Sequence, residues 1–173
     1  MEKNEKLSRA ERLILINQSR ILEYLEPESK EDLQLHREAL EKGYELEYPT
    51  YAEELISDPL PEAECVLVSK ILQMCWILQS RLAELDDLPK SPRLRVVKNV
   101  GFDGNHETAH MQYARFLVEK CGNFENISAE SRFNSHSPRL PIYKELLKRY
   151  ETELRNNLSH DPFTAEAITR ILA

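Results

Sequence analysis

The sequence predicts an all-α fold, a single multihelical domain with about six to seven helices around one central apolar helix. Three observations lead to this prediction. Apolar side chains recur at intervals of three and four residues along most of the chain. Helix-capping sequences begin several of these segments. The chain holds only 4 Gly in 173 residues, so tight β-hairpins, which need positive φ, should be rare.

Composition and charge narrow the class of protein. Hydrophobic residues make up 41% and charged residues 31%, as in soluble globular proteins. The net charge of −7 disfavours binding to nucleic acid or anionic lipid. We find no secretory signal and no apolar run of the ~18 residues that a membrane span needs. With Cys65, Cys75 and Cys121 unpaired, we expect a cytoplasmic protein without a membrane partner. Its single domain should cover residues 1–173, with residues 1–7 as a flexible tail.

The first two helices are marked by their ends. Ser8 and Glu11 form a capping box, which opens a helix expected to end at Pro27. Ser29 is predicted to cap the second helix, and Gly43 to terminate it.

The most apolar segment lies near the middle of the chain. Residues 44–48 are predicted to be extended, and residues 50–53 to begin a short helix. The segment 61–85 is apolar around nearly its whole circumference, so we expect a central helix that contacts neighbours on most sides. Trp76 in this helix would pack in the core or form a subunit interface. Residues 86–92 form the clearest loop.

The second half of the chain predicts one weak strand and three helices. Residues 94–97 are short and β-branched, which favours a strand or an extended connector. Asp103 should cap a helix that runs to Lys120. Residues 142–154 follow the helical period closely. The last helix should be capped by Ser159 or Asp161, with Pro162 in its first turn.

One short motif could indicate catalysis. His106 and His110 are four residues apart, the spacing that places two imidazoles on one helix face for zinc, and Glu107 between them could activate a bound water. A zinc-dependent hydrolase is therefore the alternative function, with these histidines as ligands and Glu107 as the base. A catalytic zinc needs a third protein ligand, for which the sequence offers only the unsupported candidates Glu125, Glu130 and His136.

A structural interpretation explains the same motif. The face of His110 continues through the apolar side chains of Tyr113, Ala114 and Leu117, which should point to the core. The positive end of the predicted helix would also disfavour a cation at His106. We therefore expect no metal, no cofactor and no catalytic residue, and treat zinc as the alternative.

Two further groups of residues could carry a function. Cys121, His136 and Asn134 supply the residue types of a cysteine hydrolase, although nothing in the sequence brings them together. A basic cluster between Lys90 and Lys98 could bind nucleic acid, a weaker alternative because no aromatic side chains accompany it.

Six short stretches in order along the chain resemble the YfbU family of bacterial proteins. They are Glu11 to Gln18, Glu41 to Tyr44, Gly101 to Asn105, Tyr113 to Phe116, Phe133 to Pro138 and Tyr143 to Leu147. The resemblance implies a mostly helical, cytosolic, self-associating protein. It implies no activity, cofactor or catalytic residue.

Two loops remain candidates for a binding site. We expect the turn at Asp103, Gly104 and Asn105 and the turn from Asn134 to Pro138, which contains His136, to converge beside His110 and line a polar cleft. The sequence as a whole favours a non-enzymatic, homo-oligomeric cytoplasmic protein that acts through self-association or other protein contacts.

Overall fold

The computed structural model describes residues 7–48, 59–85, 87, 89–156 and 162–173. Seven α-helices lie in this part of the chain, with one small two-stranded sheet, so the predicted mainly helical fold is confirmed. The contacts divide the chain into two compact units, residues 1–59 and residues 60–173. They are called unit 1 and unit 2 below, and each is described by itself.

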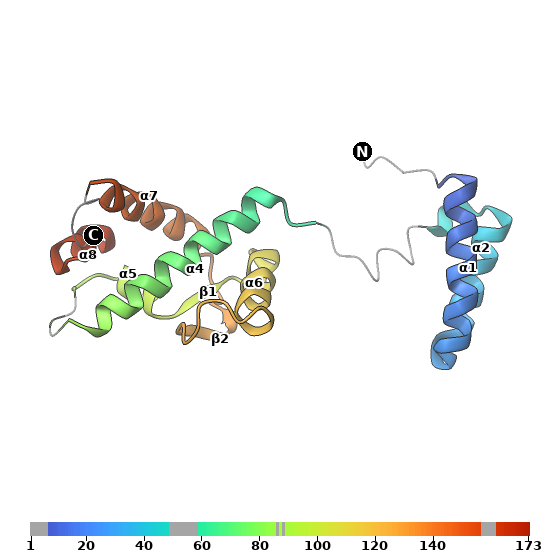
Figure 1. Cartoon of the computed structure of the whole chain (residues 1–173), viewed down its shortest axis with the longest axis horizontal. Helices are drawn as coiled ribbons and strands as arrows, with labels where there is room; N and C mark the ends of the chain where they lie inside the picture. The colour runs from blue at the N-terminus through green and yellow to red at the C-terminus, as the bar shows by residue number, and fades with distance from the viewer. Residues whose placement is uncertain (1–6, 49–58, 86, 88, 157–161) are drawn as a thin grey trace. The chain divides into compact units, whose positions relative to one another are not determined.

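Unit 1 is a helical hairpin (Figure 1). Its elements are α1 (Arg9–Leu25), the 3-10 helix η1 (Pro27–Ser29), α2 (Lys30–Lys42) and the 3-10 helix η2 (Glu45–Glu47). The predicted capping box is confirmed, because Ser8 Oγ accepts from Glu11 N at 3.2 Å and Glu11 Oε2 accepts from Ser8 N at 2.7 Å. Gly43 ends α2 with a left-handed φ of 79°, which a residue without Cβ adopts at little cost.

Two details of unit 1 differ from the prediction. Ser29 precedes α2 but its side chain makes no capping bond, because the preceding 3-10 turn already leads the backbone into the helix. Residues 45–47, predicted to be extended, form the 3-10 helix η2 instead. The short helix predicted at residues 50–53 lies outside the described residues.

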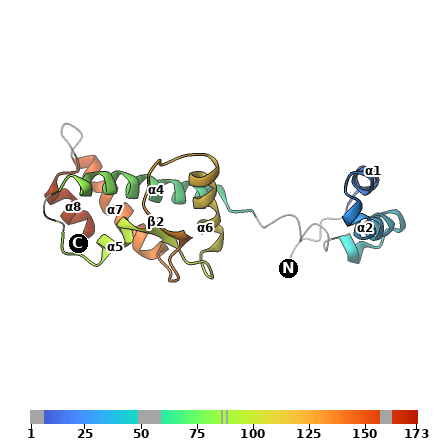
Figure 2. The ribbon, with the colours of Figure 1, turned by 90° about the horizontal axis from the view of Figure 1, so that it is seen from below.

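The two helices of unit 1 lie side by side, as the nearly end-on view in Figure 2 shows. Arg12 joins them, because its guanidinium donates to the carbonyl oxygens of Leu40 and Glu41. Arg37 on α2 also bonds Glu23 on α1, with 2.6 Å between Nε and Oε1. The buried apolar side chains among the described residues of this unit are few: Leu33, Ala39 and Leu40.

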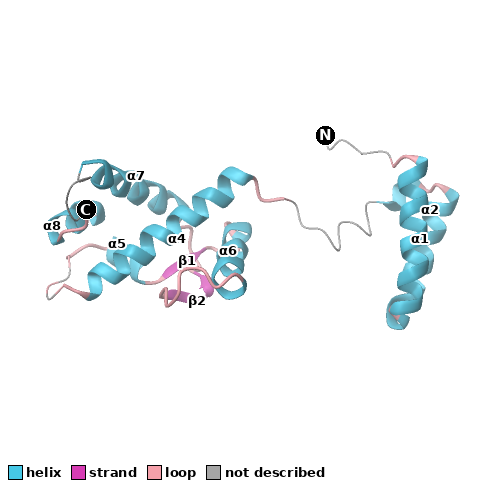
Figure 3. Ribbon diagram, viewed as in Figure 1, coloured by secondary structure: helices cyan, strands magenta, loops and turns pink. Residues whose placement is uncertain are grey.

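Unit 2 is built around α4 (Glu62–Ala83), as predicted for the segment 61–85. Figure 3 shows the other helices and the small parallel sheet beside it. These elements are α5 (Arg93–Lys98), β1 (Val100–Phe102), α6 (Thr108–Arg115), the π-helix η3 (Phe116–Lys120), β2 (Ala129–Asn134), α7 (Leu140–Asn156) and α8 (Ala165–Leu172). The largest side chains that α4 and its neighbours bury completely include Ile71, Met74, Leu78, Phe102, Tyr143 and Ile171.

By length and composition alone, α4 could also cross a membrane. The core helix of a globular unit meets the same criterion. Here α4 buries Val68, Ile71, Leu72, Met74 and Cys75 against the rest of unit 2, which is what a central core helix does.

The predictions for residues 94–97 and for the last helix were wrong in detail. The first segment is part of α5, because Ser91 Oγ accepts from Arg93 N at 3.1 Å and starts a helical turn. Thr164 caps α8 by accepting from Ala167 N at 3.3 Å, so Pro162 precedes the helix. Ser159 and Asp161 lie outside the described residues.

The sheet was not predicted. Strand β1 is only three residues long and fully buried, so it lacks the alternation that marks a strand. Strand β2 contains an irregularity: Val100 pairs with Ala129, but Phe102 pairs with Asn134. Arg132 and Phe133 have positive φ values of 52° and 58°, which bend the strand and bring Asn134 to the end of β1.

Candidate functional site

The predicted site residues begin in the loop between β1 and α6, where Asp103 organises the backbone. Its Oδ1 accepts from Asn105 N at 2.9 Å, its Oδ2 lies 2.8 Å from His106 Nδ1, and its carbonyl accepts from Glu107 N at 2.7 Å. The bond from the Asn105 amide, followed by the contact with His106, lowers the pKa of the Asp103 carboxyl. Asp103 therefore caps a tight turn, and α6 itself begins only at Thr108, which corrects the predicted helix start.

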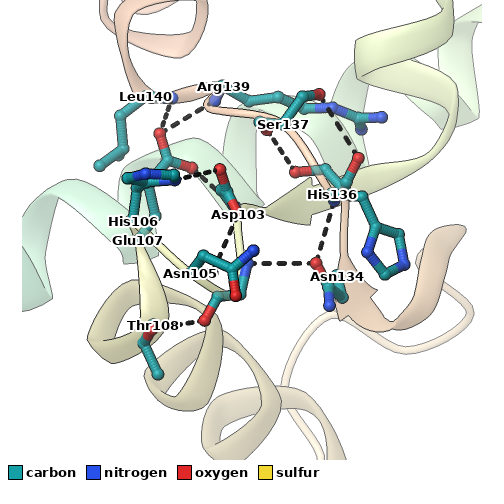
Figure 4. A network of polar contacts seen from close by, with 12 residues as sticks. Asp103, Asn105, His106, Glu107, Thr108, Asn134, His136, Ser137, Arg139 and Leu140 are labelled. Atoms are coloured by element: carbon teal, nitrogen blue, oxygen red, sulfur yellow. Dashed lines mark hydrogen bonds and ion pairs between the residues drawn. The ribbon is translucent and has the colours of Figure 1, made fainter.

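Glu107 is buried and accepts three main-chain amides, which joins the loop between β1 and α6 to the start of α7 (Figure 4). Its Oε2 accepts from Asp103 N at 3.0 Å, and its Oε1 accepts from Arg139 N at 2.9 Å and from Leu140 N at 2.8 Å. The last two amides lie at the start of α7. A carboxylate at this position satisfies amides that have no partner within the helix and interacts favourably with the helix dipole. Glu107 thus caps α7 from a segment 32 residues earlier in the chain.

The two predicted loops meet. Asn134 Oδ1 accepts from Gly104 N at 3.1 Å and from His136 N at 3.0 Å. Ser135 N also donates to Phe102 O at 3.0 Å. Figure 4 shows the Asn134 side chain between the two loops, with the His136 ring directed away from Asp103. The side chain of Asn134 therefore holds the loops together, whereas a polar cleft between them stays a prediction.

The two histidines of the motif have different partners. His106 contacts Asp103 within its own loop, and its side chain is 73% exposed. His110 lies 2.8 Å through Nε2 from Glu64 Oε2 on α4, and its ring stacks on Phe102 with the ring centroids 6.3 Å apart. The bond from His110 lowers the pKa of Glu64. Among the described residues, no three His, Cys, Asp or Glu side chains are grouped closely enough to hold a metal ion.

Sequence reasoning missed Arg139 and Tyr143, whose side chains bond the backbone of Asn99 and Gly101 beside the site. Arg139 is buried; its Nη1 donates to Asn99 O at 2.6 Å and its Nη2 bonds Glu130 at 2.8 Å. The Tyr143 hydroxyl accepts from Gly101 N and donates to Gly101 O, both at 3.1 Å. Burial raises the pKa of the Tyr143 phenol. Tyr143 was predicted only as part of an apolar helix face, and no local pattern marked Arg139 as buried.

The remaining candidates lie apart from this network. In the basic cluster, Arg93 is paired with Glu145 at 2.8 Å, while Lys90 and Arg95 are exposed. Trp76 is 43% exposed, and its Nε1 donates to Glu125 O at 3.0 Å. Cys121 is exposed.

The network around Glu107 consists largely of bonds from main-chain amides to side-chain oxygens. Both carboxylate oxygens of Glu107 accept from main-chain amides, and Asp103 and Asn134 bond main-chain amides as well. A general base needs a lone pair directed at a substrate proton. Oε1 of Glu107 accepts from the amides of Arg139 and Leu140, and Oε2 accepts from the amide of Asp103.

The family model described as "YfbU domain" matches residues 5–173 of this chain. The chain belongs to the YfbU family. A protein of Methanocaldococcus jannaschii, described as UPF0304 protein MJECS11, is 34% identical over 157 residues, which are 85% of this chain and 89% of that relative. Family membership therefore covers both units.

Proposed function

We propose that this YfbU-family protein is a non-enzymatic cytoplasmic protein that acts through self-association. The observation that supports the proposal most is an apolar face on α1. It consists of Leu13, Ile14, Ile21, Tyr24 and Leu25, and is called the α1 face below. These side chains are 57–85% exposed. Eight of the eleven large apolar side chains that are exposed in the described residues belong to unit 1.

The small core of unit 1 gives this face a physical role. Only Leu33, Ala39 and Leu40 are buried apolar residues in its described part. A segment of about 60 residues is marginally stable even with a good core. Covering the Leu and Ile side chains of the α1 face would contribute roughly 4–7 kcal/mol per copy. Two copies together would offset an association cost of about 4–15 kcal/mol, which favours a dimer of moderate affinity.

The contacts at the predicted catalytic positions also favour a non-enzymatic protein. Glu107, the base in the zinc alternative, accepts three backbone amides, and His110 bonds Glu64 rather than sharing a site with His106. Each of these contacts stabilises the local fold. None of them directs a reactive atom at a substrate position.

A charge placed on the α1 face tests the proposal. We expect the Ile21→Asp variant of the whole chain to elute with the mass of one chain, 20.2 kDa, by size exclusion with light scattering, whereas the wild type has a larger mass. Desolvating an unpaired carboxylate in an apolar interface is costly. The matched control is Leu35→Asp on α2, which adds the same charge at a side chain that is 68% exposed but outside the α1 face.

Three results would contradict the proposal. One is a wild-type mass of a single chain at all accessible concentrations. The second is an unchanged mass of the Ile21→Asp variant. The third is stoichiometric zinc in the natively purified chain that is lost in a His106→Ala variant, which would favour the hydrolase instead.

A further inference from the structure

We propose that the bond between Asp103 and Gly104 is a self-modification site, where the chain isomerises to isoaspartate unless the side chain of Asn134 holds the Gly104 amide. Asp103 and Gly104 form the only Asp–Gly pair in the sequence. Among the residues that can follow Asp, Gly hinders attack by its own amide nitrogen least, because it has no Cβ. The site lies within unit 2 and does not depend on the proposed self-association.

The reaction uses only groups of the chain itself and water. The Gly104 nitrogen attacks Cγ of Asp103, so that an N–C bond forms and a C–O bond breaks, and the amide proton leaves with the hydroxyl as water. Water then opens the resulting succinimide ring. Addition at Cγ restores Asp, whereas addition at the main-chain carbonyl carbon gives isoaspartate, which carries an extra methylene in the backbone.

The fold restrains the attacking nitrogen. Gly104 N donates to Asn134 Oδ1 at 3.1 Å, and it must leave this bond before it can reach Cγ of Asp103. The two loops lie so close together that a Cβ on Gly104 would be 2.8 Å from Asn134 Nδ2. A larger residue would therefore displace the Asn134 side chain. The contact that favours the reactive Gly at this position is the same contact that holds its amide.

The fold restrains the carboxyl group as well. The Asp103 side chain is buried, its Oδ1 accepts from Asn105 N, and its Oδ2 contacts His106 Nδ1. These bonds lower the pKa of the Asp103 carboxyl, and an ionised carboxylate is a poorer electrophile than the protonated acid. Both reacting groups are thus engaged with other partners while the loops stay together.

Isoaspartate at this position would remove the cap of α7. Asp103 N donates to Glu107 Oε2, and Asp103 O accepts from Glu107 N. The extra methylene displaces the chain that follows Asp103, and with it the carboxylate that accepts from Arg139 N and Leu140 N. A covalent change in one loop therefore breaks contacts at the start of another element, which makes unfolding of unit 2 irreversible.

Peptide mapping of the full chain after incubation measures the reaction. Trypsin releases residues 99–115, a peptide in which Asp103 is the only Asp. An Asp-specific endoproteinase cleaves this peptide where Asp103 is unmodified and leaves the isoaspartate form intact. The rate at which the resistant fraction grows is compared for the native wild type, the wild type unfolded in urea, and folded variants, with circular dichroism to confirm folding.

Four variants separate the role of Asn134 from that of overall stability. Asn134→Ala removes the acceptor, whereas Asn134→Asp keeps an acceptor oxygen. Asn105→Ala is the matched control, because it removes an exposed amide side chain from the neighbouring loop and leaves the bond from Gly104 in place. Ile171→Val lowers the stability of unit 2 through the buried core of α8, away from both loops.

We expect the native wild type to isomerise at least about tenfold more slowly than the unfolded chain. Asn134→Ala should raise the native rate about three- to tenfold, whereas Asn134→Asp, Asn105→Ala and Ile171→Val should keep it near that of the wild type.

Equal rates in the native and unfolded wild type would overturn the proposal, because the fold would then exert no control. An unchanged rate in folded Asn134→Ala, or a fast rate in folded Asn134→Asp, would overturn the role of the acceptor. A rise in Ile171→Val as large as that in Asn134→Ala would show that global unfolding sets the rate, which also overturns the proposal.

Discussion

Replacing Glu107 tests whether this residue stabilises the fold. Glu107→Ala removes the acceptor of three main-chain amides, those of Asp103, Arg139 and Leu140. A buried donor without a partner costs about 1–3 kcal/mol. The amides of Asp103 and Arg139 belong to buried residues, whereas Leu140 is only partly buried and water can reach it more easily. The expected loss in the free energy of unfolding is about 3–5 kcal/mol.

The chain offers a convenient probe for this measurement. Its single Trp, Trp76, lies on α4 in unit 2, so its fluorescence during urea unfolding reports the unit that contains Glu107. A loss of this size should also lower the melting temperature by about 10–20 °C.

Glu119→Ala is the matched control, because Glu119 forms a half-exposed ion pair with Arg115 on the same segment. Its removal should cost less than about 0.5 kcal/mol. Glu107→Gln keeps one carbonyl oxygen for the amides of α7. Its loss in the free energy of unfolding should therefore lie between the losses of Glu107→Ala and Glu119→Ala. The capping role would be refuted if Glu107→Ala unfolded within about 0.5 kcal/mol of the wild type.

Three further predictions concern other contacts. Tyr143→Phe should lose about 1–3 kcal/mol, measured by the same fluorescence, because both bonds to Gly101 disappear; an unchanged unfolding midpoint would contradict this. His110 lowers the pKa of Glu64 in the folded chain, so the bond contributes stability above the unfolded pKa near 4.5 that is lost as pH falls through the folded pKa. Glu64→Gln should therefore flatten the loss of stability below that pH, and an unchanged acid profile would exclude the linkage. Gly43→Ala should destabilise unit 1 by about 1 kcal/mol, measured by circular dichroism, because the φ of 79° is unfavourable for Ala.

The sequence predicted best the elements whose information is local. The ends of α1 and α2 followed from Ser8, Glu11 and Gly43, and the centre of unit 2 followed from the apolar circumference of α4. Each of these signals lies within the element that it marks. Propensity failed where the signal was short, as in α5, whose first turn depends on the hydroxyl of Ser91 rather than on its β-branched residues.

The candidate site was predicted only in part for a related reason. The residue types at Asp103, Glu107 and Asn134 were identified as polar and of interest, but two of the three amides that Glu107 accepts lie more than thirty residues away at the start of α7. A pattern with zinc-ligand spacing can serve a purely structural purpose when tertiary contacts supply amides to its carboxylate. Arg139 and Glu64 could not be recognised, because only the folded chain brings them to Glu130 and His110.

The most direct test of self-association is sedimentation equilibrium of the intact wild-type chain over a dilution series. We expect an average mass of at least twice 20.2 kDa at high concentration that falls towards the mass of one chain on dilution. A mass of 20.2 kDa at every concentration would contradict it.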